Sequence, residues 1–459
     1  MKQILLGVTG GLVSGLLILA VLFFGPLASD EPVAQPTPSE TAQPEATLEA
    51  APEPTEEPTV EPTEEPVQCS VAEYEDAEDI LNLQAQVVNA ETGEVLFDRG
   101  STTPARTASV LKLLTAAAAL ETLGPDYRVT TRVYVSAEDP SVLYLVGAGD
   151  VTLSRTGPGV SSVYRNAPKL SDLAAQIAKA LPEQGFSQII LDSSLYGLQD
   201  GEYQDVWDTR GFTDGYMSYV SALQVDGDRD NPAILSSPRS TNPVKRAGVW
   251  FQEALGAAAE SATISVGMAP PDAIEVASVK SAPMSTWIDY MLQVSDNTLA
   301  EALSRLVSLD VGMDGSFKSL TAAYQKALRD TGLNLAEIKI EDGSGLSRYN
   351  QVSPATFNQL LQLIDSGYGD FALIDGGMPV SGTPGSLSAR FLDAVGKVVA
   401  KTGWIRTGYS LAGFLYPEDG SKLLFTIYNL GDSVKLINRD AMDELVFAFY
   451  NCGANLVNR

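Results

Sequence analysis

The pattern of apolar and polar positions predicts strands toward both ends of the folded part of this chain, with helices between them. Apolar residues at alternate positions mark half-buried strands, and they predict strands at residues 83–88, 94–98, 127–135, 142–146, 397–400, 411–416 and 423–428. Apolar residues at the period of a helix predict helices at residues 109–123, 287–294, 298–307 and 434–450. This order predicts an α+β fold in which helices cover a mostly antiparallel sheet.

Residues 154–276 interrupt this order with turns and short elements. We interpret them as an inserted accessory domain, which divides the main domain into residues 69–153 and 277–459. A chain of 459 residues can hold one large domain or two or three smaller ones.

A long apolar stretch lies within residues 1–28. No charged residue occurs between Lys2 and Asp30, and residues 4–24 are mostly Leu, Val, Ile, Phe and Gly. A bilayer-spanning helix needs ~20 apolar residues, whereas the apolar core of a secretory signal has ~7–15. We therefore predict a single transmembrane anchor whose N-terminus stays inside the cell. A cleaved signal peptide is the alternative.

Residues 29–68 are predicted to be a disordered linker rich in Pro, Glu and Thr. Residues 30–67 contain 11 acidic residues, 9 prolines and no basic residue, so they account for 11 units of the net charge of −28. Proline and repulsion between like charges keep such a segment extended. In the polyproline form it would reach on the order of 100 Å, which would hold a domain at the depth of a cell wall.

The composition excludes several kinds of chemistry. The absence of histidine excludes a Ser-His-Asp hydrolase and His-ligated zinc or haem. Two cysteines are too few for a zinc ribbon or an iron–sulfur cluster, and a net charge of −28 argues against nucleic-acid binding. We expect no metal or other cofactor. Outside the cell Cys69 and Cys452 could form a disulfide, and two free thiols are the alternative.

The first candidate for chemistry is Ser109-Val110-Leu111-Lys112. Residues three apart share a face of a helix, so the lysine amine can reach the serine hydroxyl. Serine is a weak nucleophile until a base takes its proton, and a lysine kept neutral by its surroundings can act as that base. The alternative is a helix-start serine followed by a solvated lysine.

Two further tripeptides are candidates, although each is weak alone. Ser295-Asp296-Asn297 lies between two predicted helices, where these residue types are also ordinary helix caps. Lys401-Thr402-Gly403 ends a predicted strand, where a cation and a hydroxyl suit a substrate carboxylate. A strand end with a turn glycine is the alternative reading of that tripeptide.

Together, Ser-x-x-Lys, Ser-Asp-Asn and Lys-Thr-Gly in this order resemble the motifs of the penicillin-recognising serine enzymes. The chain is more narrowly similar to the D-alanyl-D-alanine carboxypeptidase/endopeptidase family, the class C low-molecular-mass penicillin-binding proteins (peptidase S13-like). That similarity extends to residues 113–120, 143–150, 220–223 and 342–348 and covers roughly residues 75–450. It implies a β-lactamase/transpeptidase-like fold with a helical subdomain and an insertion.

The resemblance also implies a mechanism. Ser109 would attack the carbonyl between the two terminal D-alanines of a peptidoglycan stem peptide and form an acyl-enzyme. Lys112 would act as the general base, and Ser295 would pass a proton to the leaving amine. β-Lactams would be covalent inhibitors. The sequence leaves open whether the enzyme trims a terminal D-alanine, cuts cross-links or does both.

The resemblance assigns substrate binding to Asn297, Lys401, Thr402 and Gly403, with Asn297 on the substrate amide and Lys401 and Thr402 on the terminal carboxylate. The backbone N–H groups of Ser109 and of Trp404 would form the oxyanion hole. Trp404 departs from the family, which usually has Thr or Ser after Lys-Thr-Gly.

Arg348 is a further candidate, from the place of its motif near the cleft. We expect it to contact an acidic group on the third residue of the stem, and Tyr216 to line the same pocket. A structural salt bridge is the alternative for Arg348.

The sequence argues against two other functions. A class A β-lactamase would carry a Glu-x-x-Leu-Asn segment, and none occurs in this chain. A catalytically idle cell-wall binding or scaffold protein would typically have lost the serine or the lysine of the first motif, and this chain has both. We therefore expect a peptidase held at the extracytoplasmic face of the cell membrane.

Overall fold

The computed structural model of this protein describes residues 68–197 and 201–457, which lie within one compact unit. The predicted membrane anchor (residues 1–28) and all but the last residue of the predicted linker (29–68) lie outside the described residues. Among the described residues, no helix combines the length and the apolar character needed to cross a bilayer.

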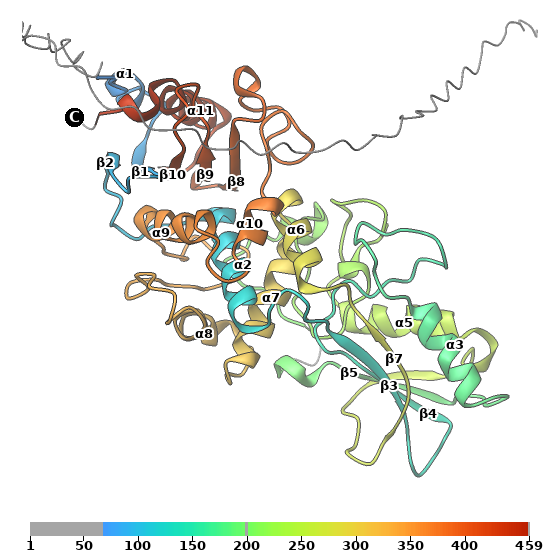
Figure 1. Ribbon diagram of the computed structural model, residues 1–459. Helices are drawn as coiled ribbons and strands as arrows, with labels where there is room; N and C mark the ends of the chain where they lie inside the picture. Colours follow the sequence, from blue (N-terminus) through green and yellow to red (C-terminus); the bar gives the residue numbers. More distant parts are fainter. Residues whose placement is uncertain (1–67, 198–200, 458–459) are drawn as a thin grey trace, which may run out of the picture. The chain divides into compact units, whose positions relative to one another are not determined.

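The first sheet has strands from both ends of the described chain. It is antiparallel throughout, in the order β2-β1-β10-β9-β8 (Figure 1). Every residue of the central strand β10 is buried, because helices cover both faces of the sheet. The strands are β1 (Asn82–Asn89), β2 (Val95–Arg99), β8 (Val398–Ile405), β9 (Gly408–Leu415) and β10 (Leu423–Leu430).

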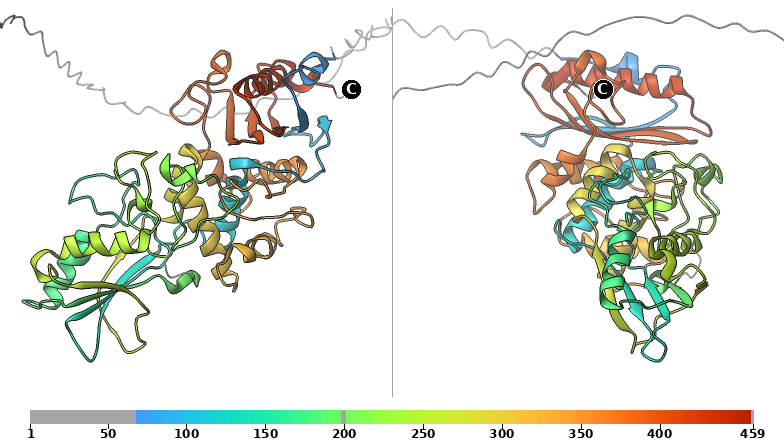
Figure 2. Two further views of the ribbon diagram at one scale, coloured as in Figure 1. Left: turned by 180° about the vertical axis from the view of Figure 1, so that it is seen from behind. Right: turned by 90° about the vertical axis from the view of Figure 1, so that its right-hand side faces the viewer.

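Alternate residues of these strands pack into two different cores. Phe425 and Ile427 face a core shared with α11 (Leu436–Cys452), whereas Leu424 and Tyr428 face a core shared with α9 (Pro354–Asp365). Figure 2 shows α11 on the face of the sheet that is turned away from α9 and the helices packed with it. This period of two is the pattern that predicted the strands. The antiparallel sheet covered by helices confirms the expected α+β fold.

The helical layer is built around α2 (Leu111–Thr122), whose residues 111–120 are all buried. Apart from Lys112 and Thr115 these residues are apolar, which suits the centre of a protein, and the alanines of α2 let its neighbours approach closely. Helices α2, α6 and α7 contact one another. Besides α9, the other helices of this layer are α6 (Met284–Val294), α7 (Asn297–Asp310), α8 (Leu320–Ala327) and α10 (Ala372–Gly377).

A second sheet is mixed, in the order β6-β5-β4-β3-β7, with β4, β5 and β6 parallel. It packs against α3 (Leu170–Ala180) and α5 (Pro243–Leu255). Its strands are β3 (Thr130–Val135), β4 (Val142–Val146), β5 (Gln188–Asp192), β6 (Thr263–Val266) and β7 (Ile274–Lys280), and the short helix α4 (Arg210–Thr213) lies in the connection between β5 and α5.

The second sheet begins earlier in the chain than the predicted insertion of residues 154–276. The strands predicted at 127–135 and 142–146 do form, but as β3 and β4 they pair with β7 and β5 of the second sheet. A boundary after residue 153 would therefore cut through this sheet. Alternation of apolar residues identifies a strand and its buried face, but it does not identify the partner strand.

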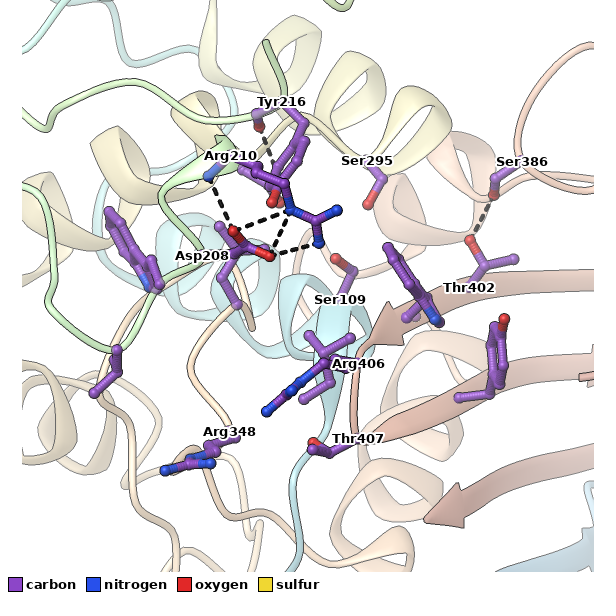
Figure 3. Close-up of a pocket in the computed structure, with 18 of the residues that line it drawn as sticks. Ser109, Asp208, Arg210, Tyr216, Ser295, Arg348, Ser386, Thr402, Arg406 and Thr407 are labelled. Carbon is purple, nitrogen blue, oxygen red and sulfur yellow. Dashed lines mark hydrogen bonds and ion pairs between the residues drawn. The ribbon is translucent and has the colours of Figure 1, made fainter. Parts of the chain in front are cut away.

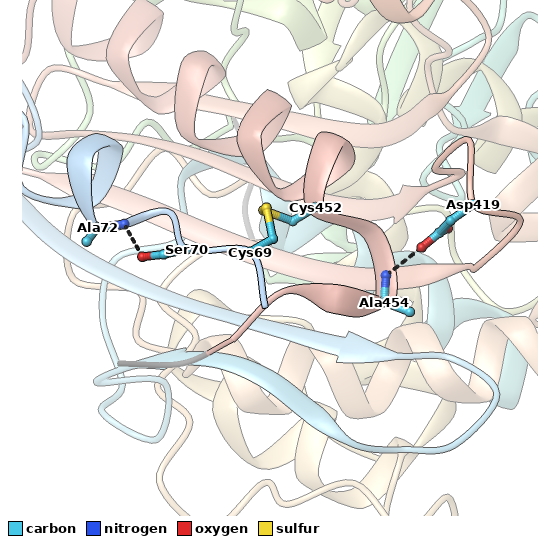
Figure 4. The surroundings of a disulfide bond; sticks show 6 residues. All are labelled: Cys69, Ser70, Ala72, Asp419, Cys452 and Ala454. Carbon is cyan, nitrogen blue, oxygen red and sulfur yellow. Dashed lines mark hydrogen bonds between the residues drawn. A yellow bond between two sulfur atoms is a disulfide. The ribbon is translucent and has the colours of Figure 1, made fainter. Parts of the chain in front are cut away.

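A disulfide between Cys69 and Cys452 joins the two ends of the described chain (Figure 4). Their Cα atoms lie 5.4 Å apart across a sequence separation of 383 residues. The Cys69 N–H donates to the Asn455 carbonyl at 2.9 Å, so backbone pairing reinforces the bridge. In the chain-entropy view, closing so long a loop stabilises the fold by on the order of 5 kcal/mol. The short helix α1 (Ala72–Glu75) follows directly.

Candidate active site

Ser109 lies in a single 3-10 turn, Ala108–Val110, that leads directly into α2. Two glycines allow neighbouring segments to approach this turn closely. A Cβ atom at Gly345 would lie 1.9 Å from the Ala108 carbonyl oxygen, and one at Gly403 would lie 2.9 Å from the Ser109 nitrogen. Ala108 itself has a φ of +44°, which is costly for a non-glycine residue. The turn is therefore held tightly between two chain segments.

The Lys112 amine lies one turn further along α2, and it is fully buried. Its Nζ donates hydrogen bonds to Ser109 Oγ at 2.9 Å, to Asn297 Oδ1 at 2.7 Å and to the Ser344 carbonyl at 2.7 Å. Burial lowers the pKa of Lys112 to about 8, although the nearby carboxylates of Asp342, Glu301 and Asp296 oppose this shift. An amine with this pKa is partly neutral near pH 8 and can accept a proton from Ser109.

The turn between α6 and α7 brings Ser295 and Asn297 to the same place. Ser295 has the left-handed conformation that ends α6, with φ of +59°. Asp296 caps α7 by accepting from Leu299 N–H at 2.9 Å. The Asn297 side chain donates to the Tyr216 carbonyl at 2.8 Å while its oxygen accepts from Lys112. The orientation of its amide is therefore defined at both ends.

A buried ion pair holds this turn from the side of the second sheet. Arg229 and Asp296 lie 2.8 Å apart, and their side chains are 1% and 3% exposed. Arg229 also donates to the Tyr164 hydroxyl at 2.8 Å. A buried pair of this kind is strongly destabilised when one partner is removed, so the residues near the second sheet help to define the position of Ser295.

Lys401 is the second buried amine of the site. Its Nζ donates to Ser295 Oγ at 3.1 Å and to the Thr402 carbonyl at 2.7 Å. Burial, together with the charge of Lys112, lowers the pKa of Lys401 well below its usual value. Two amines in one buried site disfavour each other's charged form, and an anion bound beside them would relieve this repulsion.

Lys401, Thr402 and Gly403 lie inside β8 and not at the end of a strand, which corrects the prediction. The prediction failed because the glycine was interpreted as a strand terminus. Gly403 is instead needed within the strand, since a side chain there would collide with Ser410 Oγ at 2.1 Å. Thr402 Oγ1 donates to Ser386 Oγ at 2.8 Å.

The backbone N–H of Trp404 points to the outer edge of β8, away from β9. Even-numbered residues of β8 direct this group away from β9, as shown by Ala400 N–H, which donates to the Pro379 carbonyl at 2.9 Å. Trp404 is four residues after Ala400 in the same strand, and N–H groups at alternate residues of an antiparallel strand point to the same side, so its N–H also points away from β9. Its indole side chain is 56% exposed and lines the cavity described below.

Ser109 opens into a cavity of about 1020 Å³ between the first sheet, the α6–α7 turn and the connection between β5 and α5 (Figure 3). Predicted residues on its wall include Ser295, Asn297, Thr402 and Gly403, whereas Lys112 and Lys401 lie buried behind it. Predicted Arg348 and Tyr216 also line it, together with Asp208, Arg210, Leu346, Ser386, Arg390, Arg406, Tyr409 and Arg439.

The loop after α8 supplies a group that the sequence reasoning missed, the Ser344 carbonyl. The Asp342 carboxylate holds this loop by accepting from the backbone N–H of Gly345 at 2.7 Å and of Ser347 at 2.6 Å. Trp207 Nε1 also donates to it at 2.7 Å. The motifs point to residues 342–348 and to Arg348 within them, but no side-chain pattern reveals a backbone acceptor.

Several charged wall residues were also missed. Asp208 and Arg210 form an ion pair at 2.7 Å beside the cavity, and Arg406 lies in the turn between β8 and β9. These residues belong to turns and to the four-residue helix α4, which are too short for the apolar pattern to carry a signal. Arg348 is exposed and donates to the Tyr349 hydroxyl at 2.8 Å.

An antiparallel sheet against a helical layer, with Ser-x-x-Lys, Ser-Asp-Asn and Lys-Thr-Gly meeting at one cavity, defines a penicillin-recognising type of serine enzyme. The chain matches the D-Ala-D-Ala carboxypeptidase 3 (S13) family over residues 68–236 and 229–448. It belongs to this family, which confirms the resemblance seen in the motifs.

Individual relatives agree with this assignment. The chain is 32% identical to carboxypeptidase DacB of Mycolicibacterium smegmatis over 388 residues, which cover 82% of each chain. It is 28% identical to the D-alanyl-D-alanine carboxypeptidase of Actinomadura sp. over 420 residues, covering 76% of this chain and 77% of that one.

The crystal structure of penicillin-binding protein 4 from Haemophilus influenzae has a similar fold. The TM-score is 0.68 at 20% identity, and the match covers 81% of this chain and 96% of that one. The same protein, solved in complex with a β-lactam, matches with a TM-score of 0.65.

Replacing Gly403 by Ala should slow acylation of Ser109, because the new Cβ would force β8 away from the Ser109 turn. A displacement of about 1 Å at a reacting group can cost on the order of 100-fold in rate. The measurement is the rate of labelling by a fluorescent penicillin, with the melting temperature as a check on folding.

Gly376→Ala is the matched control, because a Cβ atom there meets no atom within 4 Å. It should label at the normal rate. Normal labelling of Gly403→Ala would show that the close approach of β8 to Ser109 is not needed.

Proposed function

We propose that the protein is a serine D-Ala-D-Ala peptidase that cleaves the terminal D-Ala-D-Ala bond of peptidoglycan stem peptides through an acyl-enzyme. The observation that carries this proposal is the position of the Lys112 amine, which lies 2.9 Å from Ser109 Oγ in a buried site that opens into a large cavity. Family membership and relatives named as carboxypeptidases support the same activity.

Acylation follows from this geometry. Ser109 Oγ attacks the carbonyl carbon of the penultimate D-alanine while its proton passes to neutral Lys112. The backbone N–H groups of Ser109 and Trp404 donate to the developing oxyanion, which is stabilised where it forms. The C–N bond then breaks, and the amine of the terminal D-alanine leaves with a proton that Ser295 relays.

Substrate charge has a defined place in this scheme. Lys401 and Thr402 bind the terminal carboxylate, and that anion offsets the repulsion between the two buried amines. Asn297 orients the substrate amide beside Lys112. The attack of water on the acyl-enzyme, with Lys112 again taking a proton, releases the shortened stem and restores Ser109.

The alternatives are weaker on the same observations. An idle scaffold protein would have no reason to keep a buried lysine within hydrogen-bond distance of an accessible serine. Penicillin-binding protein 4 of H. influenzae has been solved in complex with a β-lactam, and we propose that β-lactams acylate Ser109 here too.

Incubation with a fluorescent penicillin should place a single adduct on Ser109, detected by mass mapping, and Ser109→Ala should remove it. Lys112→Ala should also abolish labelling, whereas Lys179→Ala, which changes an exposed lysine on α3, should leave it normal. Because Lys112 must be neutral and its pKa is about 8, the labelling rate should rise about tenfold per pH unit below pH 8 and level off above it. Normal acylation of Lys112→Ala would refute Lys112 as the base.

We propose that Arg348 contacts a carboxylate on the third residue of the stem, with Tyr216 lining the same pocket. Its support is an exposed guanidinium on the cavity wall, which donates to the uncharged Tyr349 hydroxyl and keeps its positive charge available to a ligand. Arg348→Ala should lower kcat/KM about tenfold or more for stems that carry this carboxylate. Stems without it should react as before, and an unchanged preference would contradict the contact.

We also propose that the N-terminal part, residues 1–28, anchors the enzyme in the cell membrane with the peptidase on the extracytoplasmic face. The uncharged apolar stretch of residues 4–24 and the acidic, proline-rich segment after it support this arrangement. The full-length chain should remain with membranes after a high-salt wash and be released by detergent. A shorter chain free of the membrane would instead indicate a cleaved signal peptide.

A further inference from the structure

Glu301 is a buried carboxylate behind the active site that the proposed mechanism does not use. It lies one turn after Asn297 on α7 and is 1% exposed. Its Oε1 accepts from the Ser344 N–H at 2.9 Å. The carbonyl of the same residue, Ser344, accepts from Lys112 Nζ at 2.7 Å and from Ser109 Oγ at 3.4 Å. Ser344 therefore connects Glu301 to both reacting side chains through its two backbone groups.

The segment that carries Ser344 is held firmly between two helices. A Cβ at Gly343 would lie 2.3 Å from Ser304 Oγ and 2.6 Å from the Ala300 carbonyl oxygen, so the backbone lies directly against α7. From the other side, Thr115 Oγ1 of α2 donates to the Gly343 carbonyl at 2.8 Å. A displacement at Glu301 would therefore be transmitted to the Ser344 carbonyl.

The charged and titratable groups around Glu301 come from several elements. Lys112 faces it from α2 and Asp342 from the loop after α8, while Arg305 lies on α7 itself and Tyr324 on α8. Uncharged Gln224 and Ser218 approach from the connection between β5 and α5. Among the described residues, Glu301 Oε2 has no hydrogen-bond partner.

We propose that Glu301 is a positioning residue that holds the Lys112 amine against Ser109 through Ser344 and tunes its basicity. A carboxylate that accepts from the Ser344 N–H fixes the backbone of Ser344, and its negative charge favours the charged form of the nearby Lys112 amine. This inference rests on the proposed role of Lys112 as the base.

The electrostatics agree with the geometry. Burial, followed by the charge of Asp342, raises the pKa of Glu301 to about 7, close to the value of about 8 for Lys112. The two groups therefore titrate over overlapping pH ranges. Ionised Glu301 raises the pKa of Lys112, so removing the carboxylate charge should lower that pKa and extend activity to lower pH.

Two variants separate charge from position. Glu301→Gln keeps an acceptor for the Ser344 N–H but removes the charge. In a plot of acylation rate against pH, the rising limb should therefore move at least half a pH unit lower. Glu301→Asp keeps the charge but shortens the side chain. In this variant the rising limb should stay at the same pH, while the maximal acylation rate at high pH falls about tenfold or more. The acylation rate with a chromogenic β-lactam, followed between pH 5 and 10, gives both the position of the limb and the maximal rate. In both variants the KM for a stem peptide should change less than twofold.

Glu75→Gln is the matched control, because Glu75 is a buried carboxylate of α1 that pairs with Arg99 at 2.8 Å, and neither residue lines the cavity. It should lower the melting temperature without moving the pH limb. If Glu301→Gln also leaves the limb in place, the proposal is wrong. Should Glu301→Gln fail to fold, a shifted limb or an unchanged plateau in Glu301→Asp would overturn it equally well.

Lys112→Ala, measured in parallel, keeps the two proposals distinguishable. If it acylates normally, the proposed base fails whatever Glu301 does. If it is inactive while the limb of Glu301→Gln is unmoved, the inference about Glu301 fails alone.

Discussion

The architecture of this active site depends on placing the amine of Lys112 out of contact with water. Burying an ammonium alone is costly, and here three acceptors from three separate elements offset that cost. Ser109 comes from the turn before α2, Asn297 from the start of α7 and the Ser344 carbonyl from the loop after α8. If any of these elements moves, the amine loses a partner, so the helical layer must be rigid where it meets the first sheet.

The segments next to the second sheet also help to keep the elements around Lys112 in place. Arg229 pairs with Asp296, and the Tyr216 carbonyl accepts from Asn297, so the turn that carries Ser295 is held from outside the helical layer. Trp207 in turn donates to Asp342, which shapes the loop of the Ser344 carbonyl. The residues between the first and second motifs are thus part of the support of the active site as well as a wall of its cavity.

Much of this could be predicted from the sequence, because the information was local. The strands of the first sheet and the start of the helix at Ser109 follow from apolar periods and spacing, and family membership confirmed the combined motifs. Long-range pairing could not be predicted. Apolar alternation did not reveal that β3 and β4 join β7 and β5, and no local pattern links Arg229 to Asp296. Glu301 carried a usable signal, since four residues after Asn297 it shares the same helix face.

The close approach of β8 to the Ser109 turn has a consequence for the order in which the enzyme is made. Ser109 and Lys112 are synthesised early, but β8, which carries Lys401 and the edge N–H of Trp404, comes about 300 residues later. Contacts so distant in sequence form slowly, because the intervening chain must first be brought together. Ser109 and Lys112 therefore lack β8 beside them until about the last seventh of the chain is being added. A chain truncated before residue 398 would hold both residues without β8 beside them.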